Sequence, residues 1–258
     1  MMAPKNKTSP AAAKKKMAEQ MAANLANKTT ASGAKKVLCL HAGPADSARL
    51  MHEQFTREAW QAVWVSANPA FKPDIVSALT KLDKIASGSV DAVWSPHTLK
   101  HLYSHEVPVV LKECYRVLKP DGFFGMFTPD LDVVCDAISR KGIEKTVYST
   151  KAGPVTGLDV LYGYGEHLKK GSLDALPKTG FTGGYLGQIL RDNGFRDITL
   201  NFKQHNIWAV GYKRAADTEK NKTIKITGDE MNARMMKRDQ IDRAPEKPVN
   251  TKFPFSLK

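Results

Sequence analysis

The chain has 258 residues, 42% of them hydrophobic, which is enough for one sizeable α/β domain with its own core. Its formal net charge of +13 gathers at the ends: residues 1–36 hold eight Lys and one Glu, and residues 213–258 hold twelve Lys or Arg against seven Asp or Glu. No apolar run has the length of a membrane span, and Cys39, Cys114 and Cys135 show no CxxC spacing, which argues against a membrane protein, a disulfide framework and a zinc site.

The three cysteines lie inside apolar stretches, as small buried hydrophobic residues do in a reducing compartment. We therefore expect a cytoplasmic protein, with organelle targeting by the Lys-rich N-terminus as the alternative. Residues 1–34 are rich in Ala, Lys and Thr and contain almost no large apolar residue, so they cannot offset their own ordering entropy. The sequence predicts a basic, disordered arm there, with a short helix near Lys14–Leu25.

The first half of the central region alternates short apolar runs with polar turns. Such runs, bounded by Pro, Asn and Gly, are typical of buried strands, and a capped run with apolar residues at helical spacing is typical of a helix. The predicted strands are Val37–His41, Trp60–Ser66, Asp74–Leu79 and Ser89–Pro96, and the predicted helix is Asp46–Phe55.

The second half begins with a strong helical pattern, in which Val107, Val110, Leu111 and Cys114 share one face. Pro120 to Gly122 are expected to stop this helix. Two alternating runs near the end, separated by Gln204 and His205, predict an antiparallel hairpin. The remaining predicted elements are a strand at Gly122–Pro129, a helical region from Leu131, a helix at Tyr185–Arg191, and the hairpin strands Asp197–Lys203 and Asn206–Lys213.

Strands that alternate with helices indicate an α/β domain with a doubly wound, mostly parallel sheet and an antiparallel edge. We place this domain at residues 35–213. The polar, mixed-charge stretch 214–258 reads as a C-terminal extension with a short helix at Asp229–Arg243 and an apolar end, Phe253-Pro254-Phe255.

The turn after the first strand reads His41-Ala42-Gly43-Pro44. In α/β folds a nucleotide-like cofactor sits at this turn, against glycines that let the backbone come close. This turn holds a single glycine and begins with a bulky imidazole. By position it is a cofactor loop, and by chemistry it is an unusual one.

Two stretches carry a family resemblance. These are "SVDAVWSPHTLKHLYSHEVPVVLKECYRVLKPDGFFGMFTPDL" and, later, "KTGFTGGYLGQILRDNGF" at Lys178–Phe195. The chain resembles the class I S-adenosylmethionine-dependent methyltransferases, and within them a bacterial type 11-like group. The resemblance covers residues 35–213 and implies a seven-stranded Rossmann-like sheet with extended tails, S-adenosylmethionine as cofactor and methyl transfer as chemistry.

The resemblance also implies where a cofactor would lie. Glycines after the first strand admit the methionine part, an acid after the second strand binds the ribose hydroxyls, a polar residue after the third meets the adenine, and the methyl group lies near the end of the fourth. No catalytic residue is identifiable. The corresponding cofactor positions of this chain are His41, Ala42, Gly43, Pro44, Ser66, Asn68, Lys81 and Ser95.

Several of these positions depart from the family pattern. Ser66 and Asn68 stand where relatives have an acidic pair, Lys81 where an acid is common, and Lys100 where the group usually has Glu. Losing a charge-assisted hydrogen bond to a ribose costs about 1–3 kcal/mol, and His41 adds bulk where close approach is needed. The sequence therefore predicts an eroded S-adenosylmethionine site.

Other constellations have plainer interpretations. His97, His101 and His105 recur every four residues, but Pro96 and the Ser104-His105 break disfavour one continuous helix, so no metal is expected. The aromatic residues Tyr162 and Tyr164, with His167, are interpreted as a packing face rather than a substrate entrance. Asp159 and Glu166 have no identifiable partner that would make either a general base.

We interpret the chain as a methyltransferase-like accessory or structural subunit that docks to a larger assembly through its basic tails, 1–34 and 214–258. The alternative is an active S-adenosylmethionine-dependent methyltransferase with an altered loop, acting on RNA or another anionic or protein substrate. A third interpretation is a nucleic-acid-binding module that uses the same fold.

Overall fold

The computed structural model describes residues 33–44, 49–150, 153–203, 205–214 and 224–227. Nearly all of the expected arm 1–34, with the helix near Lys14–Leu25, lies outside the described residues. So does most of the extension 214–258, including the helix expected at Asp229–Arg243.

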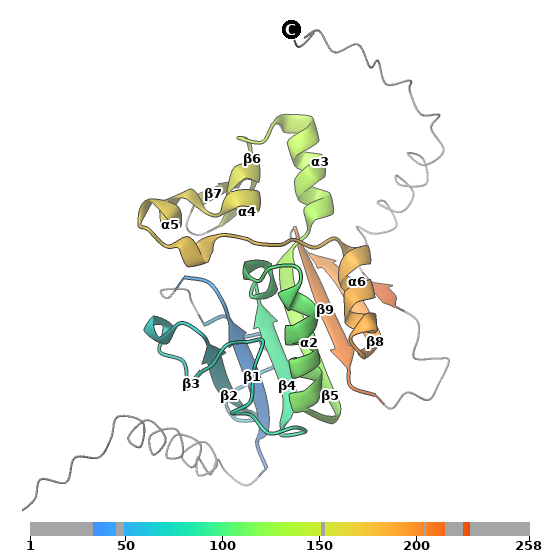
Figure 1. The fold of residues 1–258 in the computed structure, drawn as a ribbon. Coiled ribbons are helices and arrows are strands. Elements are labelled where there is room, and N and C mark those ends of the chain that lie inside the picture. Colours follow the sequence, from blue (N-terminus) through green and yellow to red (C-terminus); the bar gives the residue numbers. More distant parts are fainter. Residues whose placement is uncertain (1–32, 45–48, 151–152, 204, 215–223, 228–258) are drawn as a thin grey trace, which may run out of the picture.

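One eight-stranded sheet forms the centre of the molecule (Figure 1), with the order β10-β8-β9-β5-β4-β1-β2-β3. The strands β3, β2, β1, β4 and β5 run parallel, β9 is antiparallel to both β5 and β8, and β10 adds a parallel edge beside β8. The doubly wound, mostly parallel sheet with an antiparallel terminal hairpin is therefore confirmed. The strands are β1 (Lys35–His41), β2 (Trp60–Ser66), β3 (Ile75–Val76), β4 (Val90–Pro96), β5 (Leu118–Pro129), β8 (Arg196–Lys203), β9 (Asn206–Tyr212) and β10 (Lys225–Thr227).

Seven of these strands match the expected set, and β10 is an addition. It comes from the segment predicted as a polar extension, and its Ile226 lies opposite Leu200 of β8. Two boundaries differ from the prediction. The third strand is only two residues long, and the fifth begins at Leu118, so helix α2 ends before Pro120 rather than at it.

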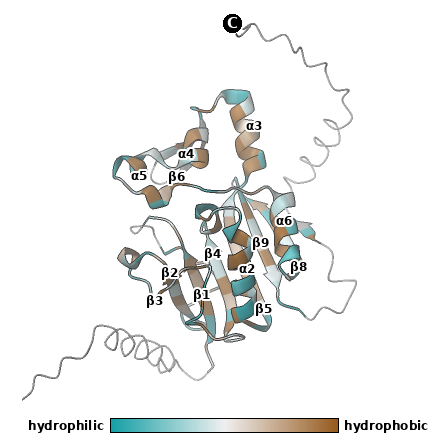
Figure 2. Cartoon of the chain, in the orientation of Figure 1, coloured by the Kyte–Doolittle hydropathy of each residue, from teal (hydrophilic) through white to brown (hydrophobic). Residues whose placement is uncertain are grey.

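Helices α2 (Glu106–Val117) and α6 (Gly183–Asp192) cover one face of the sheet, in front of it in Figure 1. The apolar positions of α2 are buried at helical spacing, and Figure 2 shows the apolar stretches along α2 and the central strands. Both helices share one continuous core with the sheet. Burial of these side chains contributes about 1.5–3 kcal/mol for each large apolar residue. The largest fully buried members are Phe124, Phe181, Phe195, Leu111, Leu118 and Leu190.

The opposite face carries an aromatic cluster that includes Phe55, Trp64 and Trp94. Residues 49–59 pack on it without forming a helix, so within the described residues the helix predicted at Asp46–Phe55 is wrong. Burial of Phe55 against Trp60, Trp94 and Phe123 fixes the path of this segment. The Trp94 indole N–H also donates to the Leu50 carbonyl over 2.8 Å, a group that a helix would keep for itself.

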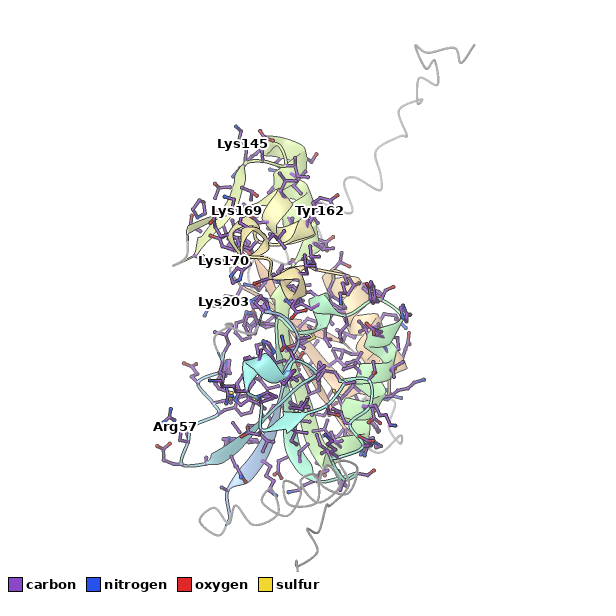
Figure 3. The ribbon with its side chains drawn as sticks, turned by 60° about the vertical axis from the view of Figure 1, so that its left-hand side comes forward. Arg57, Lys145, Tyr162, Lys169, Lys170 and Lys203 are labelled. Atoms are coloured by element: carbon purple, nitrogen blue, oxygen red, sulfur yellow. The ribbon has the colours of Figure 1, made fainter. Side chains whose placement is uncertain are left out.

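A cap, residues 131–150 and 153–182, stands over the carboxyl end of the sheet (Figure 1), and Figure 3 labels Lys145, Tyr162 and Lys169 within it. It has a small core of its own around Val134, Val155 and Val160. The helical region expected from Leu131 is present, but the hairpin within it was not expected. The cap comprises α3 (Leu131–Lys141), the hairpin β6 (Thr146–Thr150) and β7 (Gly153–Thr156), α4 (Gly157–Tyr162), α5 (Gly165–Lys169) and the short 3₁₀ helix η3 (Leu173–Ala175).

Across the described ranges, no helix is both long and apolar enough to cross a bilayer.

Candidate functional site

The carboxyl ends of β1, β2 and β4 meet beneath the cap, because parallel strands end at the same edge of a sheet. His41, the last residue of β1, lies opposite Ser66, the last residue of β2. We call this the carboxyl edge. Open α/β sheets bind their ligands here, so the predicted cofactor positions have to be judged from their contacts at this edge.

His41 makes contacts that fill the start of the loop. Its ring is stacked on Phe71, with the ring centroids 3.5 Å apart and the planes 1° from parallel. Its Nδ1 lies 3.2 Å from the Ser66 hydroxyl oxygen. The side chain is 7% exposed, and burial lowers its pKa, which favours the neutral imidazole. The position that needs a small residue for a cofactor therefore holds a ring that is packed and hydrogen-bonded.

The one glycine of the loop is covered by a second histidine. Gly43 has φ +142°, and a Cβ built on it would lie 3.3 Å from Nε2 of His101. The Nδ1 of His101 lies 3.1 Å from the Leu176 carbonyl oxygen in the cap. Ala42 packs against the main core and Pro44 is buried. The imidazole of His101 therefore occupies the space next to Gly43 through which a ligand would reach the backbone.

Ser66 and Asn68 occupy the ribose position of the resemblance, and their polar atoms are already in use. The Ser66 hydroxyl accepts the backbone N–H of Asn68 over 3.2 Å, besides lying next to His41. The Asn68 side-chain oxygen accepts the Ala70 N–H over 2.9 Å, and its amide nitrogen donates to the Asp174 carboxylate over 2.9 Å. Asp174 belongs to the cap, so a cap carboxylate lies beside these two residues.

Backbone hydrogen bonds hold the cap against this edge. The N–H groups of Lys178 and Thr179 both donate to the Lys100 carbonyl, over 2.7 and 3.2 Å. Lys100 is part of the 3₁₀ helix η2 (Leu99–His101), which follows β4 directly. The cap is therefore tied to the end of β4 as well as to the turn after β2.

Two predicted positions lie differently. The side chain of Lys81 is 77% exposed, and its ammonium lies 3.7 Å from the Asp83 carboxylate, so it does not join the other positions. Ser95 is fully buried at the end of β4, and its hydroxyl oxygen has no hydrogen-bond partner among the described residues. The structure thus brings together the positions on β1, β2 and β4 and leaves Lys81 outside.

Comparison with known proteins gives a family match over part of the chain. The family model described as "Methyltransferase domain" matches residues 51–126, from the segment before β2 into β5. This stretch contains β4, α2 and the start of β5, including the "RVLKPDG" element at the junction of α2 and β5. The match begins at Met51, after the His41–Pro44 loop.

Solved structures with similar folds are distant. A SAM-dependent methyltransferase from Archaeoglobus fulgidus is 13% identical with a TM-score of 0.48, over 77% of this chain and 94% of that one. One from Methanosarcina mazei is 12% identical with a TM-score of 0.45, over 74% and 97%. A complex of the Haloferax volcanii Trm112 methyltransferase activator with a methyltransferase is 15% identical with a TM-score of 0.43, over 80% of this chain and 96% of that one. No curated protein sequence matches the chain.

A polar network surrounds Arg116, in the "RVLKPDG" stretch at the end of α2. The Arg116 guanidinium contacts both carboxylate oxygens of Glu113, at 2.8 and 2.9 Å, and donates to the carbonyls of Leu82 and Ile85. Its hydrogen bond to Glu113 lowers the pKa of that carboxyl group. These contacts join α2 to the turn before β4. The arginine of the "RVLKPDG" stretch therefore stabilises the packing of this helix in the methyltransferase fold.

The three ionisable residues that follow β4 are desolvated. Burial, with Lys100 nearby, lowers the pKa of His97 and of His101 to about 3, so both imidazoles are neutral at pH 7. Burial lowers the pKa of Lys100 to about 8, which leaves its ammonium mostly charged at that pH. His97 has a φ of +52°, uncommon for a residue with a side chain.

Among the described residues, no group of three or more His, Cys, Asp or Glu side chains could hold a metal ion. His105 stacks on Tyr103, away from the other two histidines of its predicted stripe. Asp159 forms a capping box with Thr156 at the start of α4, a structural role.

Three contacts of this site were missed from sequence: those of Phe71, Asp174 and His101. A histidine in place of a loop glycine signals that something must pack against it, and Phe71 is the nearest aromatic residue after β2. Asp174 lies 106 residues from Asn68 in sequence and gives no local signal. The cap segment that carries it was read only as a helical region.

Proposed function

We propose that this methyltransferase-fold protein does not use S-adenosylmethionine and acts as an accessory or structural subunit of a larger assembly. The observation that carries the proposal is that its own side chains occupy the carboxyl edge. His41 is stacked and bonded, Asn68 is bonded to the cap, and His101 covers Gly43.

A cofactor would have to break these contacts before it gained any. Freeing the ribose position means losing the Asn68–Asp174 hydrogen bond, and freeing the loop means separating the His41 and Phe71 rings. Each hydrogen bond is worth about 0.5–1.5 kcal/mol and the ring pair about as much again. Residues 66–68 contain no carboxylate. The loss of these contacts is therefore not offset by charge-assisted hydrogen bonds to both ribose hydroxyls.

The proposed means of docking is the pair of tails, 1–34 and 214–258. The chain carries a net charge of +13, and the Lys and Arg excess lies in these two segments. Their partner would present an acidic or phosphate-rich surface, since Lys-rich segments bind such surfaces through counterion release. The apolar end Phe253-Pro254-Phe255 would add a local anchor.

Calorimetric titration of the full chain with S-adenosylmethionine and with S-adenosylhomocysteine tests the proposal. We expect no binding heat at millimolar ligand from a sample that unfolds cooperatively. A matched variant, Asp174→Ala with His41→Gly, removes the two contacts that fill the edge. Binding of S-adenosylmethionine by this variant would show that these side chains block the site, and no binding would show that the absence of an acid at residues 66–68 is sufficient to prevent it. Micromolar binding by the wild type would overturn the proposal and favour the active enzyme with an altered loop.

Docking is tested separately by comparing the full chain with a version that spans 33–227, which retains every described residue and strand β10. We expect the full chain to enter a large complex in cell extract, as seen by size-exclusion chromatography, and the shorter chain to elute alone. If both elute alone from extract, the tails are not docking arms. If both remain in the complex, the folded domain makes the contact.

A further inference from the structure

A cavity of about 190 Å³ opens at the amino ends of β1, β2 and β4. Three of the residues that line it, Lys36, Gln61 and Val90, each lie within the first two residues of their strands, so the cavity is at the other end of the sheet from the carboxyl edge. Helices α2 and α6 cover this face elsewhere, whereas residues 77–89 cross it here as turns (Figure 1). The helix-free crossing leaves an opening into the main core.

The floor of the cavity is apolar. Leu38, Val63 and Val90 come from three neighbouring strands, Ile75 comes from β3 and Ile85 from the turn before β4, and all five belong to the main core. An apolar cavity of about 150 Å³ accommodates benzene, whereas pockets for drug-sized molecules measure about 300–1,000 Å³. The volume therefore suits an apolar group of about six to nine non-hydrogen atoms.

The rim of the same cavity is basic. Lys36 and Lys84 line it together with the Gln61 amide, and no acidic residue among those described does. The Lys84 ammonium lies 2.6 Å from the Val76 carbonyl oxygen, which holds it on the β3 side. Neither lysine takes part in an ion pair among the described residues. The positive charge of the rim is complementary to an anionic group on a ligand.

The wall of the cavity that precedes β4 is held in place by the scaffold. The Arg116 guanidinium donates to the Ile85 carbonyl over 3.0 Å and to the Ser87 hydroxyl over 3.1 Å. The Ser89 hydroxyl donates to the Ala86 carbonyl over 2.6 Å. A wall that is fixed before a ligand arrives reduces the ordering entropy that binding costs. The network around Arg116 thus shapes a preformed site.

We propose that this cavity binds a small carboxylate with an apolar body. The body fills the space over Leu38, Val63 and Val90, and the carboxylate faces Lys36 and Lys84. An aromatic acid and a short-chain aliphatic acid share this chemistry, and the experiment below distinguishes them. The inference does not rest on the proposed function, because the cavity and the carboxyl edge lie at opposite ends of the strands.

Titration of the full chain, followed by NMR of the methyl groups that line the cavity, tests the proposal. The ligands are benzoate, hexanoate and the uncharged benzyl alcohol, each at pH 7 and constant ionic strength. We expect saturable shifts centred on the methyl groups of Leu38, Val63 and Val90. The better carboxylate should bind with a dissociation constant of about 0.1–1 mM and the alcohol about tenfold more weakly. A preference for benzoate identifies an aromatic body, and a preference for hexanoate an aliphatic one.

Variants of the rim test the role of its charge. The double variant Lys36→Met with Lys84→Met should bind the carboxylate about tenfold more weakly, with the affinity for the alcohol unchanged. Lys112→Met, which removes an exposed charge on α2, should bind both as wild type does. An equal loss in Lys112→Met would show general ion screening and overturn the proposal.

Variants of the wall test the space. Ala86→Leu lengthens a side chain that lines the cavity and should abolish the binding of all three ligands, whereas Ala78→Leu, outside the lining, should leave it unchanged. If Ala86→Leu fails to fold, the methyl shifts of the wild type still decide.

Three results of the wild-type titration would each overturn the proposal. These are no saturable shift with any ligand, shifts centred outside the cavity, and equal affinity for the carboxylates and the alcohol. Contacts between the cavity methyl groups and residues 1–32 in the ligand-free chain would also overturn it, because the chain's own arm would then occupy the space.

Discussion

The scaffold around Arg116 and the carboxyl edge around Lys100 belong to the same methyltransferase fold but treat their charges in opposite ways. Arg116 donates to Glu113 and to two backbone carbonyls, and Lys119 donates to Asp91 over 2.8 Å. The Lys100 ammonium has no ion pair among the described residues, and the buried hydroxyl of Ser95 on β4 has no hydrogen-bond partner there either. The charges of Arg116 and Lys119 are therefore paired with carboxylates of the fold, whereas the charge of Lys100 is not paired with any described carboxylate.

That difference distinguishes the scaffold around Arg116, which stabilises the fold, from the carboxyl edge, where a ligand would bind. A bonded network stabilises the domain whatever the domain does, so it can persist after a catalytic role has gone. An unbonded buried charge costs stability.

Acidification should give the largest effect and should act on the edge alone. His97 and His101 have pKa values of about 3 in the folded chain, against an ordinary value of 6.5. The unfolded state therefore binds more protons between these values, so stability falls as pH falls below 6.5. Between pH 6.5 and 5 the two residues together should cost about 3 kcal/mol, measured by urea unfolding.

The double variant His97→Gln with His101→Gln supplies the control for that prediction. Its unfolding free energy should change much less over the same pH range, although His41, whose pKa burial also lowers, adds a smaller loss in the same direction. Parallel pH curves for wild type and variant would contradict the buried, neutral state of the two histidines.

Removal of the scaffold arginine comes next in size. Arg116→Ala removes the guanidinium donor from the Glu113 carboxylate, which keeps only the Leu82 N–H, and from two carbonyls, and we expect a loss of about 2–4 kcal/mol in urea unfolding. Arg140→Ala is the matched control, because Arg140 contacts Asp136 over 2.8 Å with its side chain 54% exposed. That exposed pair should be worth less than about 0.5 kcal/mol. Equal losses in the two variants would show that the network has no special weight.

The two regions also differ in how far the sequence predicted them. Helix α2 and the strands were predicted because their apolar residues follow a local period, and the contacts they make preserve that period. The helix at Asp46–Phe55 failed because Phe55 is drawn into the aromatic cluster and Leu50 bonds to Trp94, 44 residues away. A local pattern cannot report such a competing contact.

The site was predicted by position and only partly by contact. The resemblance placed His41, Ser66 and Asn68 at one edge, where the structure has them. It could not indicate that Asp174 bonds to Asn68, because the cap reaches back over 106 residues. Nor could it show that Lys100 has no ion pair among the described residues, since that depends on all of its neighbours at once.

A smaller effect, of opposite sign, is expected from Lys100→Met. The pKa of Lys100 is lowered to about 8 from 10.5, so the folded state disfavours the charge, and the stability advantage of the variant over wild type should shrink as pH increases from 8 toward 10.5. At pH 7 the variant should be more stable than wild type by about 1–3 kcal/mol. Burial also raises the pKa of the Cys39 and Cys114 thiols, so the stability of both proteins should fall above their ordinary value of 9.0, and the difference between the two proteins reports Lys100. A variant that is less stable than wild type at pH 7 would contradict this prediction, because it would show that the ammonium has a partner within the chain.

The smallest effect concerns the cap. Asp174→Ala removes one exposed hydrogen bond to Asn68 and should lower the unfolding free energy by about 0.5–1 kcal/mol. Asp192→Ala is matched to it, because Asp192 likewise accepts one exposed hydrogen bond, from Gln188 over 2.7 Å, but on α6. What distinguishes the two is hydrogen exchange at the Lys178 and Thr179 amides, which bond the cap to Lys100.

Asp174→Ala should speed exchange at those two amides, and Asp192→Ala should leave them unchanged, because only Asp174 lies between the cap and the turn after β2. Equal rates in both variants would mean that the backbone bonds to Lys100 hold the cap without help. In that case the cap is fixed from the β4 side, through the backbone of Lys100. Faster exchange in Asp174→Ala alone would instead make the Asn68–Asp174 bond the part of the closure that a ligand has to open first.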